Sequence, residues 1–219
     1  MTPALKREWP ALILFAALGG VTTYTWRRAG DRVPVHFTLA GHADAYGTSA
    51  HALLAIPIAA IVLYALLLLW PRVDPRGRSF EGFARTFRTV RLTVLGLFVV
   101  MQIALAQAAL SPTASLPSVL TLAEAVALIV IGNYLPKTEP NWIFGVRTPW
   151  TLSSDLAWHK THRLAGPLMV ASGAITIPAA SVSTRTGTLT LITCLIATAL
   201  VSSIYSYLVW RTDPARDHS

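Results

Sequence analysis

The chain has 219 residues, of which 53% are hydrophobic and only 13% are charged. A soluble domain carries roughly 25% charged residues, so this composition excludes a soluble globular protein and indicates one that uses lipid as its solvent. The formal net charge of +8 would also fit a nucleic-acid-binding protein. However, the basic residues lie in loops beside apolar runs, where anionic headgroups and membrane topology explain them better. We therefore expect no direct binding of nucleic acid.

Apolar runs recur along the sequence, each close to the ~20 residues that cross a bilayer as a helix. A charged start, Lys6 and Arg7, precedes the first run and would also fit a signal peptide. Tryptophan at both ends of this run and the lack of a clean cleavage site favour a retained helix. The pattern predicts an all-α integral membrane protein with six transmembrane helices, at residues 9–26, 53–70, 92–110, 119–135, 167–183 and 187–210.

The distribution of lysine and arginine predicts the orientation of these spans. With both termini in the cytoplasm, 14 of the 18 basic residues lie on the cytoplasmic side and four lie outside. Short cytoplasmic loops carry an excess of lysine and arginine. The loop after the first span should therefore face the exterior, and the segment between the fourth and fifth spans should face the cytoplasm.

The outer loop, residues 27–51, has its own pattern. Val33–Leu39 is expected to be extended, because Pro34 disfavours a helix at Val33 and alternation follows. Gly41 and Gly47 permit turn geometries. The loop also holds residues of metal-ligand type, but their spacing matches no standard zinc motif and an ordered turn explains them equally well. These residues are His36, His42, Asp44 and His51.

Residues 72–91 carry six arginines and an apolar stripe at helical spacing. This pattern predicts a basic amphipathic helix on anionic headgroups, and a docking surface for an acidic partner is the alternative. The stripe consists of Phe80, Phe83, Phe87 and Val90.

Polar residues also occur inside the predicted spans. Gln102 and Gln107 are expected to bond between helices. Glu124 is the clearest intramembrane acid and should face the bundle interior, reach the interface or be protonated. Asn133 is a further intramembrane polar candidate.

The segment from Asn141 to Gly166 is polar, aromatic and basic, although it joins two apolar spans. Ser153 and Ser154 are suitable N-caps for a helix that begins at Asp155. Three interpretations remain open for this segment. Asp155, His159 and His162 could bind a metal; Arg147 and Arg163 could hold a phosphate or an acidic partner; or the polar groups satisfy one another and anchor an interfacial hairpin.

The same segment carries a resemblance to the SdpI family of bacterial membrane immunity proteins. The matching motifs are Gly132-Asn-Tyr-Leu-Pro-Lys, Asn141-Trp-x-x-Gly-x-Arg-Thr-Pro-Trp-Thr-Leu-Ser-Ser and Trp158-x-x-Thr-His-Arg-x-x-Gly. The outer loop, with Val33-Pro-x-His-Phe, Gly41, Asp44 and Tyr46-Gly47, is similar to DUF1648, a domain that precedes it in this family. His42 and His159 fall outside the family pattern, and His36 and His162 would lie on opposite sides of the membrane, which disfavours a metal site.

The resemblance implies a multi-pass protein of the bacterial inner membrane that protects the cell from a secreted membrane-active peptide toxin, without catalysis and without a cofactor. It also implies a possible cytoplasmic transcriptional repressor as partner. A membrane-embedded metal-dependent enzyme or a small-solute transporter is the alternative. We expect a DUF1648-like unit at 1–70, a connecting segment and span at 71–118, and an SdpI-like unit at 119–219.

The candidate binding or signalling residues follow from these motifs. On the cytoplasmic side they are Asn141, Trp142, Gly145, Arg147, Thr148, Pro149, Trp150, Trp158, Thr161, His162 and Arg163. In the outer loop they are Pro34, His36, Phe37, Gly41, Asp44, Tyr46 and Gly47.

Overall fold

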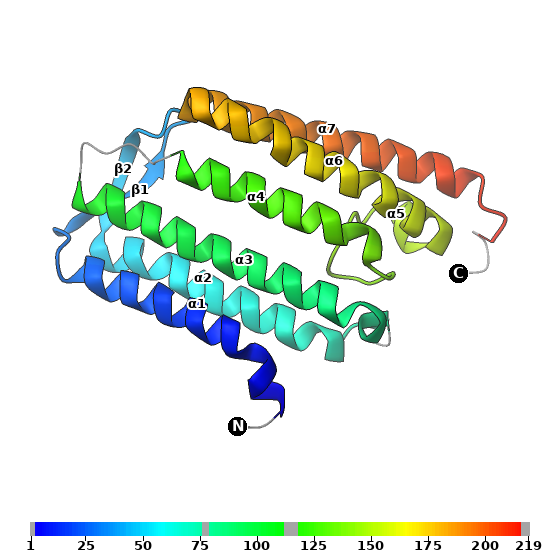
Figure 1. Ribbon diagram of the computed structural model, residues 1–219, viewed down its shortest axis with the longest axis horizontal. Helices are drawn as coiled ribbons and strands as arrows, with labels where there is room; N and C mark the ends of the chain where they lie inside the picture. Colours follow the sequence, from blue (N-terminus) through cyan, green and yellow to red (C-terminus); the bar gives the residue numbers. More distant parts are fainter. Residues whose placement is uncertain (1–2, 76–78, 112–117, 216–219) are drawn as a thin grey trace.

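The computed structural model describes residues 3–75, 79–111 and 118–215, with side chains from residue 8 onward and, in α3, from residue 82. Within these ranges the chain is predominantly helical, as predicted, with one small hairpin (Figure 1). The elements are α1 (Pro3–Trp26), β1 (Arg32–Phe37), β2 (Ala43–Thr48), α2 (Ser49–Leu69), η1 (Trp70–Arg72), α3 (Ser79–Leu110), α4 (Val119–Tyr134), η2 (Leu135–Lys137), α5 (Pro149–Leu152), α6 (Asp155–Val182) and α7 (Thr184–Arg211).

Five helical segments of the described chain are long and apolar enough to cross a bilayer. They are Ser49–Arg72, Gly82–Leu110, Val119–Lys137, Asp155–Val182 and Thr184–Arg211. Large apolar side chains cover their outer faces, for example Ile61 on α2 and Ile204 on α7, which are 56% and 61% exposed. Apolar exposure on this scale fits helices that face lipid. α1 is a further long helix but is not among the five, so the sixth span stays a prediction.

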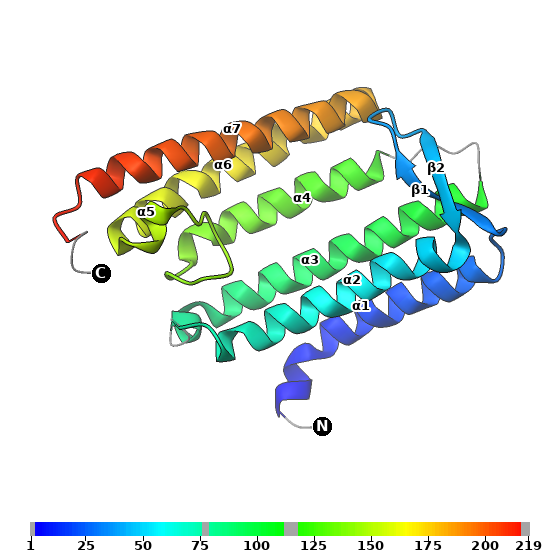
Figure 2. The same ribbon diagram turned by 180° about the vertical axis from the view of Figure 1, so that it is seen from behind.

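The helices form two groups of three. α1, α2 and α3 pack together, and α6 packs along both α4 and α7. Contacts between α3 and α4 join the two groups (Figures 1 and 2). α4 and α6 approach closely at Gly132 and Gly166, where a Cβ on Gly132 would lie 2.7 Å from the Gly166 carbonyl oxygen. Small residues at such crossings let helices in lipid pack backbone to backbone.

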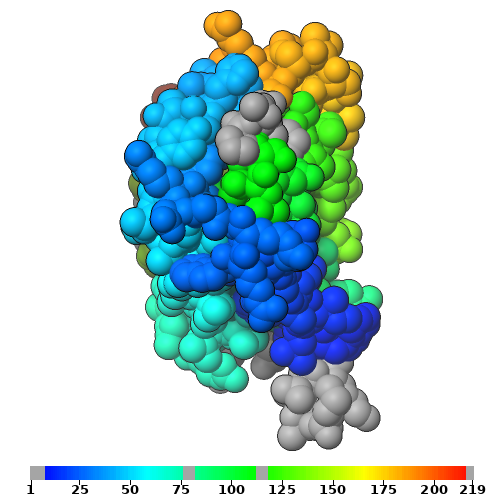
Figure 3. All heavy atoms as spheres, turned by 90° about the vertical axis from the view of Figure 1, so that its left-hand side faces the viewer, coloured from blue at the N-terminus to red at the C-terminus, as the bar shows by residue number. Residues whose placement is uncertain are grey.

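The outer loop forms an antiparallel hairpin of β1 and β2. This is more regular structure than the single extended stretch and turn expected from sequence. Gly41 lies in the connecting turn with a φ of 84°, as the turn prediction requires. Val33 anchors the hairpin, because its fully buried side chain packs against Leu53 of α2 and Leu105 of α3. Figure 3 shows the hairpin lying across this end of the bundle.

The expected amphipathic helix on the membrane surface is not present as such. The described part of that segment belongs to α3, which continues into the bilayer with a kink at Phe83. Phe83 and Phe87 are buried against Trp70, Ile143 and Phe144 rather than on headgroups. Val90, the last member of the stripe, is also buried. The surface interpretation is therefore wrong for these three residues; the side chain of Phe80 lies outside the described side chains. Likewise, the helix expected from Asp155 and the fifth span are one helix, α6.

Candidate functional site

The loop between α4 and α5 is built around the side chain of Asn141, which is fully buried. Its Nδ2 donates to the carbonyls of Glu139 and Phe144 at 2.9 and 3.1 Å. Its Oδ1 accepts the backbone N–H groups of Ile143 and Phe144 at 3.0 and 2.8 Å. One amide side chain thus satisfies four backbone groups that have no helix or strand to pair with. Asn141 fixes the shape of this loop.

Gly145 brings the loop onto α6. Its φ of 125° is a conformation that residues with a Cβ rarely adopt. The following residue, Val146, donates its backbone N–H to Nε2 of His162 at 3.0 Å. Nδ1 of His162 in turn donates to the Trp158 carbonyl at 2.7 Å. Because Nε2 accepts a hydrogen bond, the buried ring is neutral and carries its proton on Nδ1.

Trp158 completes this buried cluster. Its indole ring stacks on His162 with centroids 4.1 Å apart, and its Nε1 donates to the Thr138 carbonyl at 3.0 Å. Both rings are fully buried. Thr161, on the same helix, is also fully buried, and its hydroxyl has no hydrogen-bond partner among the described residues. Both ends of the loop are therefore attached to one face of α6.

The Thr148-Pro149-Trp150 motif forms the short helix α5. Thr148 and Thr151 cap each other, since each hydroxyl accepts the other residue's backbone N–H, at 3.2 and 2.9 Å. Thr148 also bonds to Ser206 of α7 at 2.9 Å, and the Trp150 ring packs edge-on against Tyr207. α5 is thus attached to α7.

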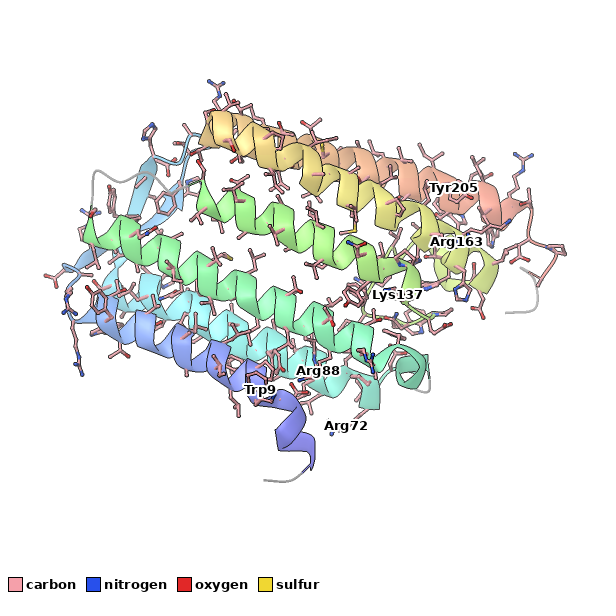
Figure 4. The ribbon with its side chains drawn as sticks, viewed as in Figure 1. Trp9, Arg72, Arg88, Lys137, Arg163 and Tyr205 are labelled. Atoms are coloured by element: carbon pink, nitrogen blue, oxygen red, sulfur yellow. The ribbon has the colours of Figure 1, made fainter. Side chains whose placement is uncertain are left out.

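Arg147 and Arg163 are exposed, unlike the buried members of the motif. Arg147 donates from Nη1 to the Trp142 carbonyl at 2.7 Å. The Trp142 side chain is itself 44% exposed. Figure 4 shows Arg163 on α6 and Lys137 after α4 at the end of the bundle away from the hairpin. The exposed part of the motif therefore presents an indole ring and guanidinium groups.

Asp74 also contributes to the site, although it lies outside the motif. Its Oδ2 accepts the backbone N–H of Trp142 at 2.9 Å and Nε1 of Trp70 at 3.0 Å. The only sequence signal is an aspartate four residues after Trp70. Together with the contact of Phe83 and Phe87 with Ile143 and Phe144, it ties the loop to the α2–α3 end of the first helix group.

The helix start predicted at Asp155 is confirmed. Ser154 is the N-cap and accepts the backbone N–H of Ala157 at 2.9 Å. Its hydroxyl also donates to Asp213 after α7. The proposed metal ligands on α6 do not converge on one point. Nε2 of His159 lies 3.7 Å from Oε2 of Glu139, whereas both ring nitrogens of His162 are hydrogen-bonded to backbone groups. In this segment the structure favours the interpretation in which polar groups satisfy one another.

The outer motif lies at the opposite end of the molecule. His36 Nδ1 and Asp44 Oδ1 are 2.6 Å apart on the exposed face of the hairpin. Pro34 and Phe37 line a cavity beneath it, and Tyr46 is 43% exposed. Gly47 packs against Val35 across the strands. Within the described residues, no three histidine, cysteine, aspartate or glutamate side chains gather closely enough to hold a metal ion.

Polar residues in the spans divide between the interior and the outer face. Gln102 is fully buried and donates to Thr22 of α1 at 3.0 Å and to the Leu53 carbonyl of α2 at 3.2 Å, which confirms its predicted role. Gln107 is exposed and makes no interhelical bond to the described residues, so that prediction is wrong. Asn133 is also exposed and bonds back to Ile129 in its own helix. Glu124 is half-buried.

A charged cluster that no sequence motif marks lies between the helices of the first group. Glu8 of α1 accepts from Arg91 of α3 at 2.9 Å and from the hydroxyl of Tyr64 on α2. Arg91 is only 7% exposed. One carboxylate thus joins all three helices, and pairing is what makes a buried arginine tolerable there.

Comparisons with known proteins match both regions of the chain. Residues 137–206 match the SdpI/YfhL protein family, and residues 12–61 match the domain of unknown function DUF1648. An 82-residue segment is 29% identical to the immunity protein SdpI of Bacillus subtilis (strain 168). That segment covers 37% of this chain and 40% of the relative. No solved structure matches the chain. The chain thus contains a segment similar to DUF1648 followed by a segment similar to the SdpI/YfhL family.

Proposed function

We propose that the chain is a membrane immunity protein that protects a bacterial cell from a secreted membrane-active peptide toxin. The observation that carries this proposal is the SdpI match over residues 137–206, which contain the buried cluster of Trp158 and His162. The chain is a multi-pass membrane protein with five apolar helices in its described part. The tightly hydrogen-bonded loop fits a binding or sensing protein better than an enzyme, because its polar groups are used to hold the fold.

We further propose that α1 is the sixth span, that both termini are cytoplasmic and that the host membrane is the inner membrane. Arg72, Lys137 and Arg163 lie at the end away from the hairpin, which supports a cytoplasmic placement of that end (Figure 4). In this orientation Arg147, Arg163 and Trp142 form a cytoplasmic surface for a protein partner such as a transcriptional repressor. We also propose a DUF1648-like unit at 1–70, a connecting segment and span at 71–118 and an SdpI-like unit at 119–219.

Cysteine labelling tests this orientation. In a Cys194→Ser background, a cysteine at exposed Ala45 of β2 should react with an impermeant maleimide applied to intact cells, because the hairpin faces outward. A cysteine at Leu156, which is 39% exposed near the start of α6, should react only after the cells are opened. Labelling in the reverse order would invert the topology.

Protection itself is tested in a bacterial strain that is killed by a membrane-active peptide of known sequence. Cells that express the chain should form colonies at a peptide dose that kills cells with an empty vector. Membrane abundance is measured in the same cultures. Killing at full membrane abundance would contradict the immunity function.

The same assay separates a binding role of Arg147 from a purely structural one. Arg147→Lys keeps the positive charge but loses the planar fork that binds a carboxylate or phosphate through two bonds. We expect this variant to reach the membrane normally and to lose protection. If Arg147→Lys protects as well as the wild type while Arg147→Ala is absent from the membrane, Arg147 has only a structural role.

A further inference from the structure

A cavity of about 330 Å³ lies beneath the hairpin, where the two helix groups meet. It is bounded by Pro34, Val35 and Phe37 of the hairpin strand, by the start of α2 and by Met101 and Leu105 of α3. Leu120 of α4 is part of its lining as well. The cavity is apolar apart from His51 at the start of α2. Its size is at the lower end of the range for pockets that hold small ligands.

Glu124 lies one helical turn from this cavity. Residues four apart on a helix share a face, so Glu124 follows Leu120 on the side of α4 that borders the cavity. The backbone of Ala125, the next residue, lies against α6, since a Cβ on Gly173 of α6 would be 2.4 Å from the Ala125 carbonyl oxygen. Glu124 is half-buried, and no hydrogen bond or ion pair joins it to another described residue. A carboxylate at membrane depth without a partner is costly.

We propose that this cavity and Glu124 form the binding site for an apolar segment that carries a positive charge, as a lysine-bearing stretch of a membrane-active peptide does. This inference rests on the proposed immunity function and names the chemistry of its ligand. Apolar side chains fill the cavity, and an ammonium group one turn deeper supplies the counter-charge that the described protein does not provide. Burial of both charges makes their attraction stronger than at an exposed surface.

The position of the site supports a peptide that arrives from outside. The hairpin covers the cavity, and α2 and α3 on one side and α4 on the other supply its walls. A ligand between these helices therefore contacts both groups at their outer end. An acyl chain of a lipid would fit the apolar part equally well, but it would leave Glu124 unpaired. Charge is thus the property that distinguishes the two occupants.

Three matched photoprobes test the proposal on the full chain in phosphatidylcholine nanodiscs. Each probe has the same twelve-carbon chain with an aryl diazirine, and the head is a primary ammonium, a hydroxyl or a carboxylate. After irradiation, mass spectrometry measures the label on the peptides that contain Met101, Leu105 and Leu120. Label on Ile61 and Leu200, exposed on α2 and α7, corrects for the concentration of each probe in the lipid.

We expect the ammonium probe to label the cavity peptides about tenfold more than the hydroxyl probe, the factor for one partly buried charge contact. Glu124→Gln should abolish this difference without reducing the label from the hydroxyl probe. Leu120→Trp, which fills the cavity, should reduce the label from all three probes, while Val126→Trp, on the face of α4 away from the cavity, should not.

Equal labelling by the three probes, or a preference for ammonium that persists in Glu124→Gln, would overturn the proposal. Failure here is distinct from failure of the immunity function, because the survival assay needs no assumption about the ligand's charge. Survival with no charge preference leaves the protein an immunity protein that holds its peptide elsewhere. A charge preference without survival assigns the cavity a cationic ligand other than the toxin.

Discussion

Replacing Gly145 by alanine is expected to lower the free energy of unfolding by about 3 kcal/mol. An alanine Cβ would lie 2.2 Å from Nε2 of His162, and the φ of 125° is unfavourable for any side chain. Relief of the clash requires the loop to move away from α6, which breaks the bond from Val146 N–H to His162. The strain and the lost hydrogen bond therefore add in the same direction.

The measurement is an unfolding titration in mixed micelles of a mild detergent and sodium dodecyl sulfate, followed by tryptophan fluorescence. Gly96→Ala is the control, because a Cβ at Gly96 of α3 meets nothing within 4 Å. Alanine inside a helix is favoured over glycine by roughly 0.5–1 kcal/mol, so this variant should be as stable as the wild type or slightly more stable. If Gly145→Ala is as stable as the wild type, the loop does not require a positive φ at this position.

The sequence predicts the helical elements well because hydrophobic length is a local property. The second to fourth apolar runs lie in α2, α3 and α4, except that Trp70 and Leu135 at their ends belong to η1 and η2. The turn at Gly41 and the N-cap Ser154 also follow from local chemistry. Helix limits are less predictable. The apolar pattern places the start of a span at Pro167, yet α6 passes through it from Asp155. In a membrane protein, neighbouring helices can compensate for the hydrogen bond that a proline removes.

The phenylalanine stripe of α3 shows what a local pattern cannot decide. An apolar face beside arginines has the same pattern whether it meets lipid or protein. Phe83 and Phe87 meet protein because the loop with Ile143 and Phe144, more than 50 residues later, folds over them. The partner is distant in sequence, so periodicity alone cannot identify it.

The candidate site was predictable as a segment but not as a network. The motif from Asn141 to Arg163 marks one continuous segment, and the structure brings most of its residues together. The chain reverses at Gly145 and brings Val146 onto His162. This reversal determines which residues of the motif are buried. The same reversal leaves Arg147 exposed. Asp74 comes from the other helix group, and a single acidic residue after a tryptophan carries no signal of that pairing.

Replacing His162 by alanine is the second large effect that we expect, with a loss of about 4 kcal/mol in the free energy of unfolding. The ring is fully buried and stacked on Trp158, so its removal leaves a cavity beside the indole. It also leaves the Val146 N–H, its partner at 3.0 Å, without an acceptor. A buried donor without a partner costs more than the hydrogen bond itself contributes.

His159→Ala is the matched control, because His159 lies on the same helix and its side chain is 46% exposed near Glu139. An exposed pair of this kind contributes roughly 0–1 kcal/mol, so this variant should unfold at nearly the wild-type detergent ratio. His162→Gln tests the hydrogen bond separately, since its amide can present an oxygen near the position of Nε2. Its stability should lie between those of the wild type and His162→Ala. If His162→Ala unfolds at the same detergent ratio as His159→Ala, the contact between the loop and α6 does not stabilise the fold. In that case the buried cluster of Trp158 and His162 does not hold the motif in place.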